Sequence, residues 1–173
     1  MLDKVTHSVV AYTHGRFTET KSSRPSIASG GVLYASNRQL LSGFIMNLQQ
    51  FSLQGSDDVE MLTAVLAVAL SPDDYELDVL RTGTEPVKDR LALFQISDCD
   101  VKGLAPHFRN MAKEKLKSRP LDVKLTSRQR GSFKHARDFS KQGLHIRPGF
   151  QRVSFSDDGD VVEGPHCTWA SLG

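Results

Sequence analysis

The chain has few of the features that mark a secreted or membrane protein. Its 173 residues include two cysteines, Cys99 and Cys167, in unrelated contexts, whereas small secreted domains that depend on disulfides carry more of them. The N-terminus lacks the apolar core of a signal peptide. The longest apolar run, Met61 to Leu70, is too short to span a bilayer. We expect an intracellular protein, cytoplasmic or nuclear, not secreted and without a transmembrane segment.

Signatures of catalysis and of metal binding are also absent from the sequence. There is no nucleophile elbow of the Gly-x-Ser-x-Gly type, no phosphate-binding Gly-x-x-x-x-Gly-Lys-Ser/Thr and no Gly-x-Gly-x-x-Gly. The six histidines are scattered, and only His166 lies beside a cysteine, without the spacing of a zinc site. We expect no catalytic residues, no metal and no cofactor, which favours a protein that is not an enzyme.

Charge is distributed unevenly along the chain, although the formal net charge is only +2. Residues 57–101 contain eleven acids and three bases, a net charge of −8. Residues 102–152 contain fourteen bases and three acids, a net charge of +11. The two segments could neutralise each other in the fold. The other interpretation is that the basic segment keeps an exposed positive face for a polyanion.

Hydrophobic patterns predict mixed secondary structure. Alternation in 5–12, a glycine-led apolar run at 30–35 and similar patterns farther along predict strands. The expected strands are 5–12, 30–35, 75–81, 87–96, 121–125, 144–147 and 150–155, the last followed by an Asp158-Gly159 hairpin into 161–162. The expected helices are one capped by Asn37 with apolar positions from Leu40 to Phe51, one over 61–70 preceded by the capping pair Asp57 and Glu60, one from Pro106 to about 118, and a weak one within 127–142.

Strands and helices alternate without a regular βαβ rhythm, which predicts the α+β class. We expect residues 1–173 to form a single compact domain in which a mostly antiparallel sheet packs against two or three helices. The segment 16–29 is rich in Ser, Thr and Lys and contains Pro25, so we expect a mobile loop there. We expect a semi-ordered tail at 164–173.

The basic segment is the candidate binding site. Phosphate contacts need only charge and geometry, and phenylalanines between the cations could stack on bases. The preferred hypothesis is therefore a non-enzymatic structural protein that binds nucleic acid, RNA rather than DNA. Packaging, coat and matrix proteins, such as those of viruses, are the candidate classes. The residues expected to contact nucleic acid are Arg109, Lys113, Lys117, Arg119, Arg128, Arg130, Lys134, Arg137 and Lys141.

Three alternatives remain open. The basic face could dock an acidic protein partner or a second copy of the chain, giving an interaction module or a homo-oligomer. The same cations could bind an anionic membrane surface. A metal-dependent nuclease or hydrolase could instead use the acidic group of Asp73, Asp74, Glu76 and Asp78.

Overall fold

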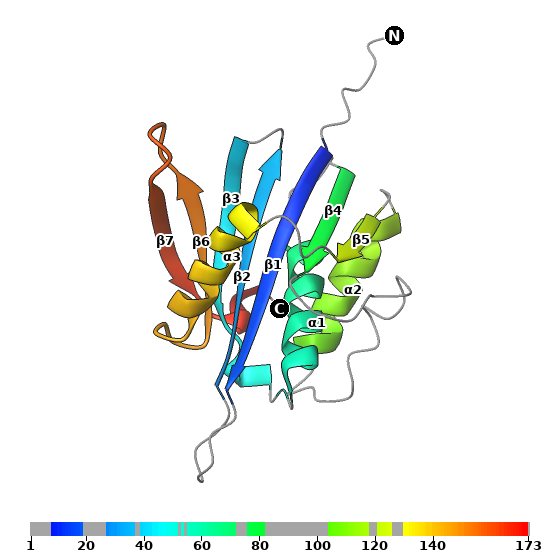
Figure 1. The fold of residues 1–173 in the computed structure, drawn as a ribbon. Coiled ribbons are helices and arrows are strands. Elements are labelled where there is room, and N and C mark those ends of the chain that lie inside the picture. The colour runs from blue at the N-terminus through cyan, green and yellow to red at the C-terminus, as the bar shows by residue number, and fades with distance from the viewer. Residues whose placement is uncertain are drawn as a thin grey trace.

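The computed structural model describes residues 8–18, 27–36, 39–51, 53, 55–71, 76–81, 104–117, 121–125 and 130–172. Within these residues the elements, shown in Figure 1, are β1 (Ser8–Thr18), β2 (Ile27–Ser36), β3 (Gln39–Asn47), the 3-10 helix η1 (Gln49–Phe51), α1 (Ser56–Ala69), β4 (Glu76–Arg81), α2 (Leu104–Lys117), β5 (Leu121–Leu125), α3 (Arg130–Gly143), β6 (Gly149–Phe155), β7 (Val161–Cys167) and the 3-10 helix η3 (Trp169–Leu172).

The strands form one sheet in the order β5-β4-β1-β2-β3-β6-β7. The five strands from β1 to β7 in this order pair antiparallel. On the other side of β1, β4 and β5 continue the sheet in parallel. The expected α+β domain with a mostly antiparallel sheet and a few helices is therefore confirmed, and its compact body is seen in Figure 1.

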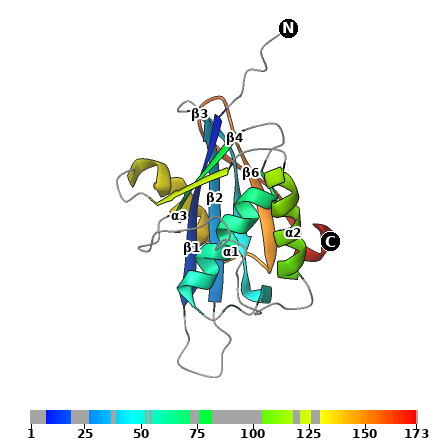
Figure 2. The same ribbon diagram turned by 90° about the vertical axis from the view of Figure 1, so that its right-hand side faces the viewer.

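Helices cover both faces of the sheet. Figure 2 shows α1 and α2 on one face and α3 on the other. The alternation predicted for the first strand explains how β1 serves both sides: Val9 and Ala11 enter the core beneath α1, whereas Tyr12 packs against the smaller core beneath α3. Residues 5–7 of that expected strand lie outside the described residues.

Helix α1 is the central helix of the larger core. The apolar run that predicted it is buried almost all round, including Leu62 and Leu66. The expected capping pair is wrong, because the N-cap is Gly55 and no side chain caps the helix. Burial of the apolar residues therefore stabilises this helix more than its first turn does.

The helix expected from Asn37 to Phe51 is wrong, since most of this segment is β3. Its apolar residues also suit a strand that is covered on both faces: Phe44 and Met46 enter the larger core and Ile45 enters the smaller one. Pairing with β2 and β6 on its two sides satisfies its backbone. The helical spacing of the apolar residues was therefore a coincidence in a strand that is buried on both faces.

The two segments expected to be irregular are more ordered than predicted. Residues 16–18 continue β1 and 27–29 belong to β2, which leaves only 19–26 of the expected loop outside the described residues. The C-terminal tail contains most of β7 and η3. Trp169 is fully buried and donates its indole N–H to the carbonyl of Asn47 at 2.8 Å. Rings of Phe51 and Phe150 lie 5.3 and 5.1 Å from it, centroid to centroid.

Other predicted elements have mixed outcomes. The strands at 76–81, 121–125 and 149–155 and the helices of α2 and α3 are present. The strand expected at 144–147 is wrong: Leu144 and His145 instead donate to the carbonyls of Lys141 and Gln142, which closes a turn after α3. The strand expected at 87–96 lies outside the described residues. In the part of the chain that the structure describes, no helix is long and apolar enough to cross a membrane.

Candidate functional site

The outer face of α3 carries a row of cations. Lys134, Arg137 and Lys141 are exposed and follow the i, i+3, i+7 spacing that places side chains on one face of a helix. Ala136 and Phe139 on the opposite face are buried against the sheet. The row, called here the α3 cation row, extends about 10 Å along the helix axis. Its charges therefore face solvent while the apolar positions hold the helix in place.

Two glycines allow the backbone of α3 to lie directly on the sheet. A Cβ at Gly31 of β2 would lie 2.0 Å from the carbonyl oxygen of Ala136 and 2.7 Å from the amide nitrogen of Ser140. A Cβ at Gly143, the last residue of α3, would lie 2.2 Å from the carbonyl oxygen of Met46. Neither position has room for a side chain. The location of the α3 cation row therefore depends on glycine at both contacts.

Hydrogen bonds through Ser140 bring a further cation to this helix. Arg16 of β1 donates from Nε to the Ser140 hydroxyl at 2.8 Å. The Ser29 hydroxyl donates to the Ser140 carbonyl at 2.7 Å, and the Ser140 hydroxyl itself donates to the carbonyl of Arg137 at 2.6 Å. Since Ser140 is fully buried, the guanidinium of Arg16 is fixed against α3.

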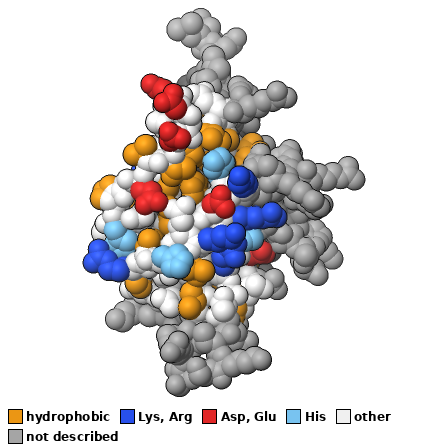
Figure 3. All heavy atoms as spheres, turned by 60° about the vertical axis from the view of Figure 1, so that its left-hand side comes forward, with side chains coloured by type: hydrophobic (Ala, Val, Ile, Leu, Met, Phe, Trp, Pro, Cys, Tyr) orange, Lys and Arg blue, Asp and Glu red, His pale blue; other side chains and the backbone are white. Residues whose placement is uncertain are grey.

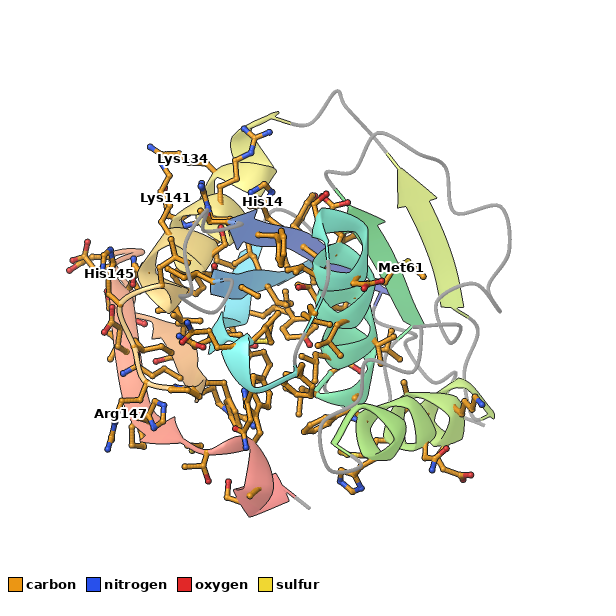
Figure 4. The ribbon with its side chains drawn as sticks, turned by 90° about the horizontal axis from the view of Figure 1, so that it is seen from below. His14, Met61, Lys134, Lys141, His145 and Arg147 are labelled. Atoms are coloured by element: carbon orange, nitrogen blue, oxygen red, sulfur yellow. The ribbon has the colours of Figure 1, made fainter. Side chains whose placement is uncertain are left out.

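The cations converge around His14. Figure 4 shows this residue of β1 between α3 and α1. Its partial burial, followed by the charges of Arg16, Arg137 and Lys141, lowers the pKa of His14 from 6.5 to about 4. The imidazole is therefore neutral at neutral pH while three permanent cations surround it. These four residues are called here the His14 cluster.

This lowered pKa predicts a pH-dependent stability. The unfolded chain binds a proton at His14 below pH 6.5 and the folded chain does so only below about pH 4, so the stabilisation is complete above 6.5 and is lost as the pH falls towards 4. Because the side chain is only half-buried, we expect a loss of about 1 kcal/mol between pH 7.5 and pH 5. Urea unfolding of wild type and of His14→Gln at both pH values measures it. An equal pH dependence in the two proteins would contradict the prediction.

The positive surface continues past the end of α3. His145 and Arg147 are exposed in the turn that leads to β6. Figure 4 shows them on the same side of the molecule as Lys134 and Lys141. In Figure 3 the Lys and Arg side chains lie in the lower part of this face, among histidines and a few acidic side chains, whereas a group of acidic side chains stands at its upper end. Positive charge is therefore concentrated in the lower part of the face, and the upper end is acidic.

The residues predicted to contact nucleic acid do not all share this face. Lys134, Arg137 and Lys141 lie together on α3. Arg109, Lys113 and Lys117 belong to α2, which packs against α1 on the opposite side of the sheet (Figure 2). Arg130 is the first residue of α3, and Arg119 and Arg128 lie outside the described residues. A continuous basic segment of sequence is therefore divided between two faces, because β5 separates the two helices along the chain.

Sequence reasoning missed His14 and Arg16, which are central to the site. The first was considered only as one of six scattered histidines, and the second was assigned to a loop. A signal was available: the alternation that predicts the first strand continues through both residues, on the same side as Tyr12. Their proximity to α3 depends on contacts more than a hundred residues apart in sequence.

A metal ion does not fit the described part of this site. Among the described residues no three side chains of His, Cys, Asp or Glu are grouped to hold one. Of the acidic group considered for a nuclease, Asp73 and Asp74 lie outside the described residues, while Glu76 and Asp78 belong to β4. The charges around His14 are positive and repel a divalent cation. The His14 cluster therefore suits an anion.

Solved structures with a similar fold include RNase H domains. RNase H1 from Halobacterium salinarum NRC-1 matches with a TM-score of 0.53 and 14% identity, over 80% of this chain and 98% of that one. A foamy viral protease-reverse transcriptase in complex with dsDNA matches with a TM-score of 0.55 and 13% identity, over 84% and 99%. LC11-RNase H1 in complex with an RNA/DNA hybrid matches with a TM-score of 0.50 and 14% identity, over 80% and 97%. No protein-family model and no curated protein matches the sequence. The chain therefore has an RNase H-like fold.

The fold corrects the functional expectation. The expectation of a non-enzymatic, viral structural protein of the packaging, coat or matrix type is wrong, because the similar folds are those of nucleases. The nuclease alternative agrees better with this finding. Charge along a sequence indicates affinity for a polyanion, and it does not distinguish a protein that packages nucleic acid from one that processes it.

Proposed function

We propose that this chain binds nucleic acid on the α3 side of its sheet, with phosphates contacting the α3 cation row and Arg16. The observation that carries the proposal is the convergence of Arg16, Arg137 and Lys141 on His14 from two elements. Lys and Arg are the side chains that most often neutralise phosphates. At about 3.4 Å of rise per nucleotide, a row of about 10 Å matches roughly three nucleotides of one strand.

The ligand that we propose contains RNA, as in an RNA/DNA hybrid. The support comes from the fold neighbours, among which one structure holds a hybrid and another holds dsDNA. An acidic protein, a second copy of the chain and an anionic membrane would use the same charges. No contact or comparison favours any of these three, so they serve as competitors in the test.

Hydrolysis of the bound nucleic acid is the second candidate, and the RNase H-like fold is the observation that favours it. Glu60 of α1 is a described acid beside β1, since a Cβ at Gly15 would be 3.0 Å from the amide nitrogen of Glu60. It lies on the α1 face of the sheet, opposite to the α3 cation row. The other acids that such a reaction would need do not group with it among the described residues.

Titration of a fluorescent RNA/DNA hybrid against the protein tests both candidates. We expect the logarithm of the association constant to fall linearly with the logarithm of the salt concentration, with a slope of about −0.9 for each phosphate contact. Heparin, anionic vesicles, single-stranded RNA and dsDNA are the competitors. Failure to bind any nucleic acid at low salt would overturn the proposed function. The same mixtures incubated with Mg²⁺ and resolved by length report cleavage, and a hybrid that stays intact would reject the second candidate.

A further inference from the structure

A cavity lies at the acidic end of the same face. It has a volume of about 300 Å³ and is lined by Gln39, Leu40, Phe155, Ser156, Asp157 and Gly159, which come from the start of β3 and from the β6–β7 turn. This volume is at the lower limit of small-molecule sites, about 300 to 1,000 Å³. The cavity therefore has room for a planar ring system and not for a folded peptide segment.

The turn that forms one wall of the cavity is held by hydrogen bonds. The amide of Ser156 donates to the carbonyl of Asp160 at 2.9 Å, and the amide of Gly159 donates to the carbonyl of Ser156 at 2.8 Å. The Ser156 hydroxyl accepts from the amide of Asp160 at 3.1 Å. Gly159 has a φ of 83°, which glycine adopts readily. The position of Asp157 at the rim is therefore set by the backbone of a closed turn.

The lining combines an apolar wall with polar rim groups. Phe155 and Leu40 are half-buried because they pack against the smaller core beneath α3. Gln39 and Asp157 are exposed. An aromatic ring offers a stacking surface to a nucleobase of any kind. A carboxylate accepts hydrogen bonds from exocyclic amino groups of bases, and an amide can both donate and accept.

The cavity adjoins the α3 cation row. The ring of Phe155 contacts the ring of His135 edge-on, with centroids 5.7 Å apart. His135 follows Lys134, the first member of the row, so a strand held along α3 would bring one end to the cavity. Phosphates would be repelled there by the exposed carboxylates of Asp157, Asp158 and Asp160. A neutral base would not be repelled.

We propose that this cavity accepts one unpaired nucleobase of a strand whose phosphates lie on the α3 cation row, with a preference for bases that carry an exocyclic amino group. The base stacks against Phe155, and Asp157 accepts the amino hydrogens. This inference rests on the proposed nucleic-acid binding. It adds a base-dependent component to a contact that is otherwise indifferent to sequence.

The test compares short single-stranded oligonucleotides of equal length, namely oligoadenylate, oligouridylate and an abasic strand. We expect the wild type to bind oligoadenylate about ten-fold more tightly than the abasic strand, because stacking of one base on an aromatic ring usually contributes that much to affinity. It should also bind oligoadenylate more tightly than oligouridylate. Asp157→Asn should reduce the preference for adenine over uracil. Asp158→Asn is the matched control, because it removes the same charge from the same turn at a residue that does not line the cavity. Phe155→Leu keeps an apolar side chain in the core. It should lower the affinity for oligoadenylate to nearly that for the abasic strand.

The outcomes separate the two proposals. If all three strands bind with equal affinity and neither the Asp157 nor the Phe155 variant changes their ratios, the base site is overturned and phosphate binding stands. If Asp157→Asn and Asp158→Asn have equal effects, the carboxylate acts only through its charge and the base contact is rejected. If no strand binds, the proposed function fails and the base site fails with it.

Discussion

Reversing the charges of the α3 cation row should weaken nucleic-acid binding by about 100-fold or more. The variant is Lys134→Glu, Arg137→Glu and Lys141→Glu. All three side chains are exposed, so the fold should tolerate the changes, and each glutamate replaces attraction to a phosphate by repulsion. Fluorescence anisotropy with an RNA/DNA hybrid at low salt measures the loss. The slope of the logarithm of the association constant against the logarithm of the salt concentration should also become shallower, because fewer phosphates are neutralised.

A matched control is available on the other face of the sheet. The control carries the substitutions Arg109→Glu, Lys113→Glu and Lys117→Glu, which change the net charge of α2 by the same amount. We expect its affinity for nucleic acid to fall by less than about ten-fold, because only the weaker long-range field changes. Circular dichroism confirms that both variants are folded. Equal losses in the two variants would mean that net charge alone governs binding. A larger loss in the α2 variant would place the binding surface on the opposite face and overturn the proposal.

Replacing Gly31 by alanine should destabilise the protein by about 3 kcal/mol. The added methyl group would lie 2.0 Å from the carbonyl oxygen of Ala136, so α3 must move away from β2. This movement would loosen the smaller core, where Phe139 packs against Leu33 and Ile45. Urea denaturation measures the change in the free energy of unfolding.

Gly55→Ala is the control for that substitution. A Cβ at Gly55 would meet nothing within 4 Å, and its φ of −169° is extended backbone that any residue adopts. The expected change is within about 0.5 kcal/mol. Similar stabilities of the Gly31 and Gly55 variants would show that α3 does not need the close backbone contact with the sheet.

Local patterns predicted several of the elements correctly. The apolar run of α1 and the alternation in β4 both suit the structure observed. The pattern failed for β3, where a strand buried on both faces is as apolar as a buried helix. Neighbouring strands decided that case, because β2 and β6 satisfy the backbone hydrogen bonds of β3 on both sides.

The candidate site was predictable only in part for a related reason. Clustering of cations in 102–152 is visible in the sequence, and the spacing of Lys134, Arg137 and Lys141 indicates one helical face. Arg16 and His14 come from the first strand, and their proximity to α3 results from the Ser140 hydrogen bonds and from the absence of a side chain at Gly31. Such long-range packing leaves no periodic signal.

The amino-acid sequence was sufficient to predict the α+β class, most of the helices and strands, and an excess of positive charge in the second half of the chain. These properties follow from side-chain periodicity and composition, which are local. The tertiary structure alone decided that the basic segment is divided between two faces of one sheet, that β1 adds His14 and Arg16 to one of them, and that a cavity adjoins it. Each of these depends on which strands are neighbours, and strand order is set by the burial of both sheet faces at once.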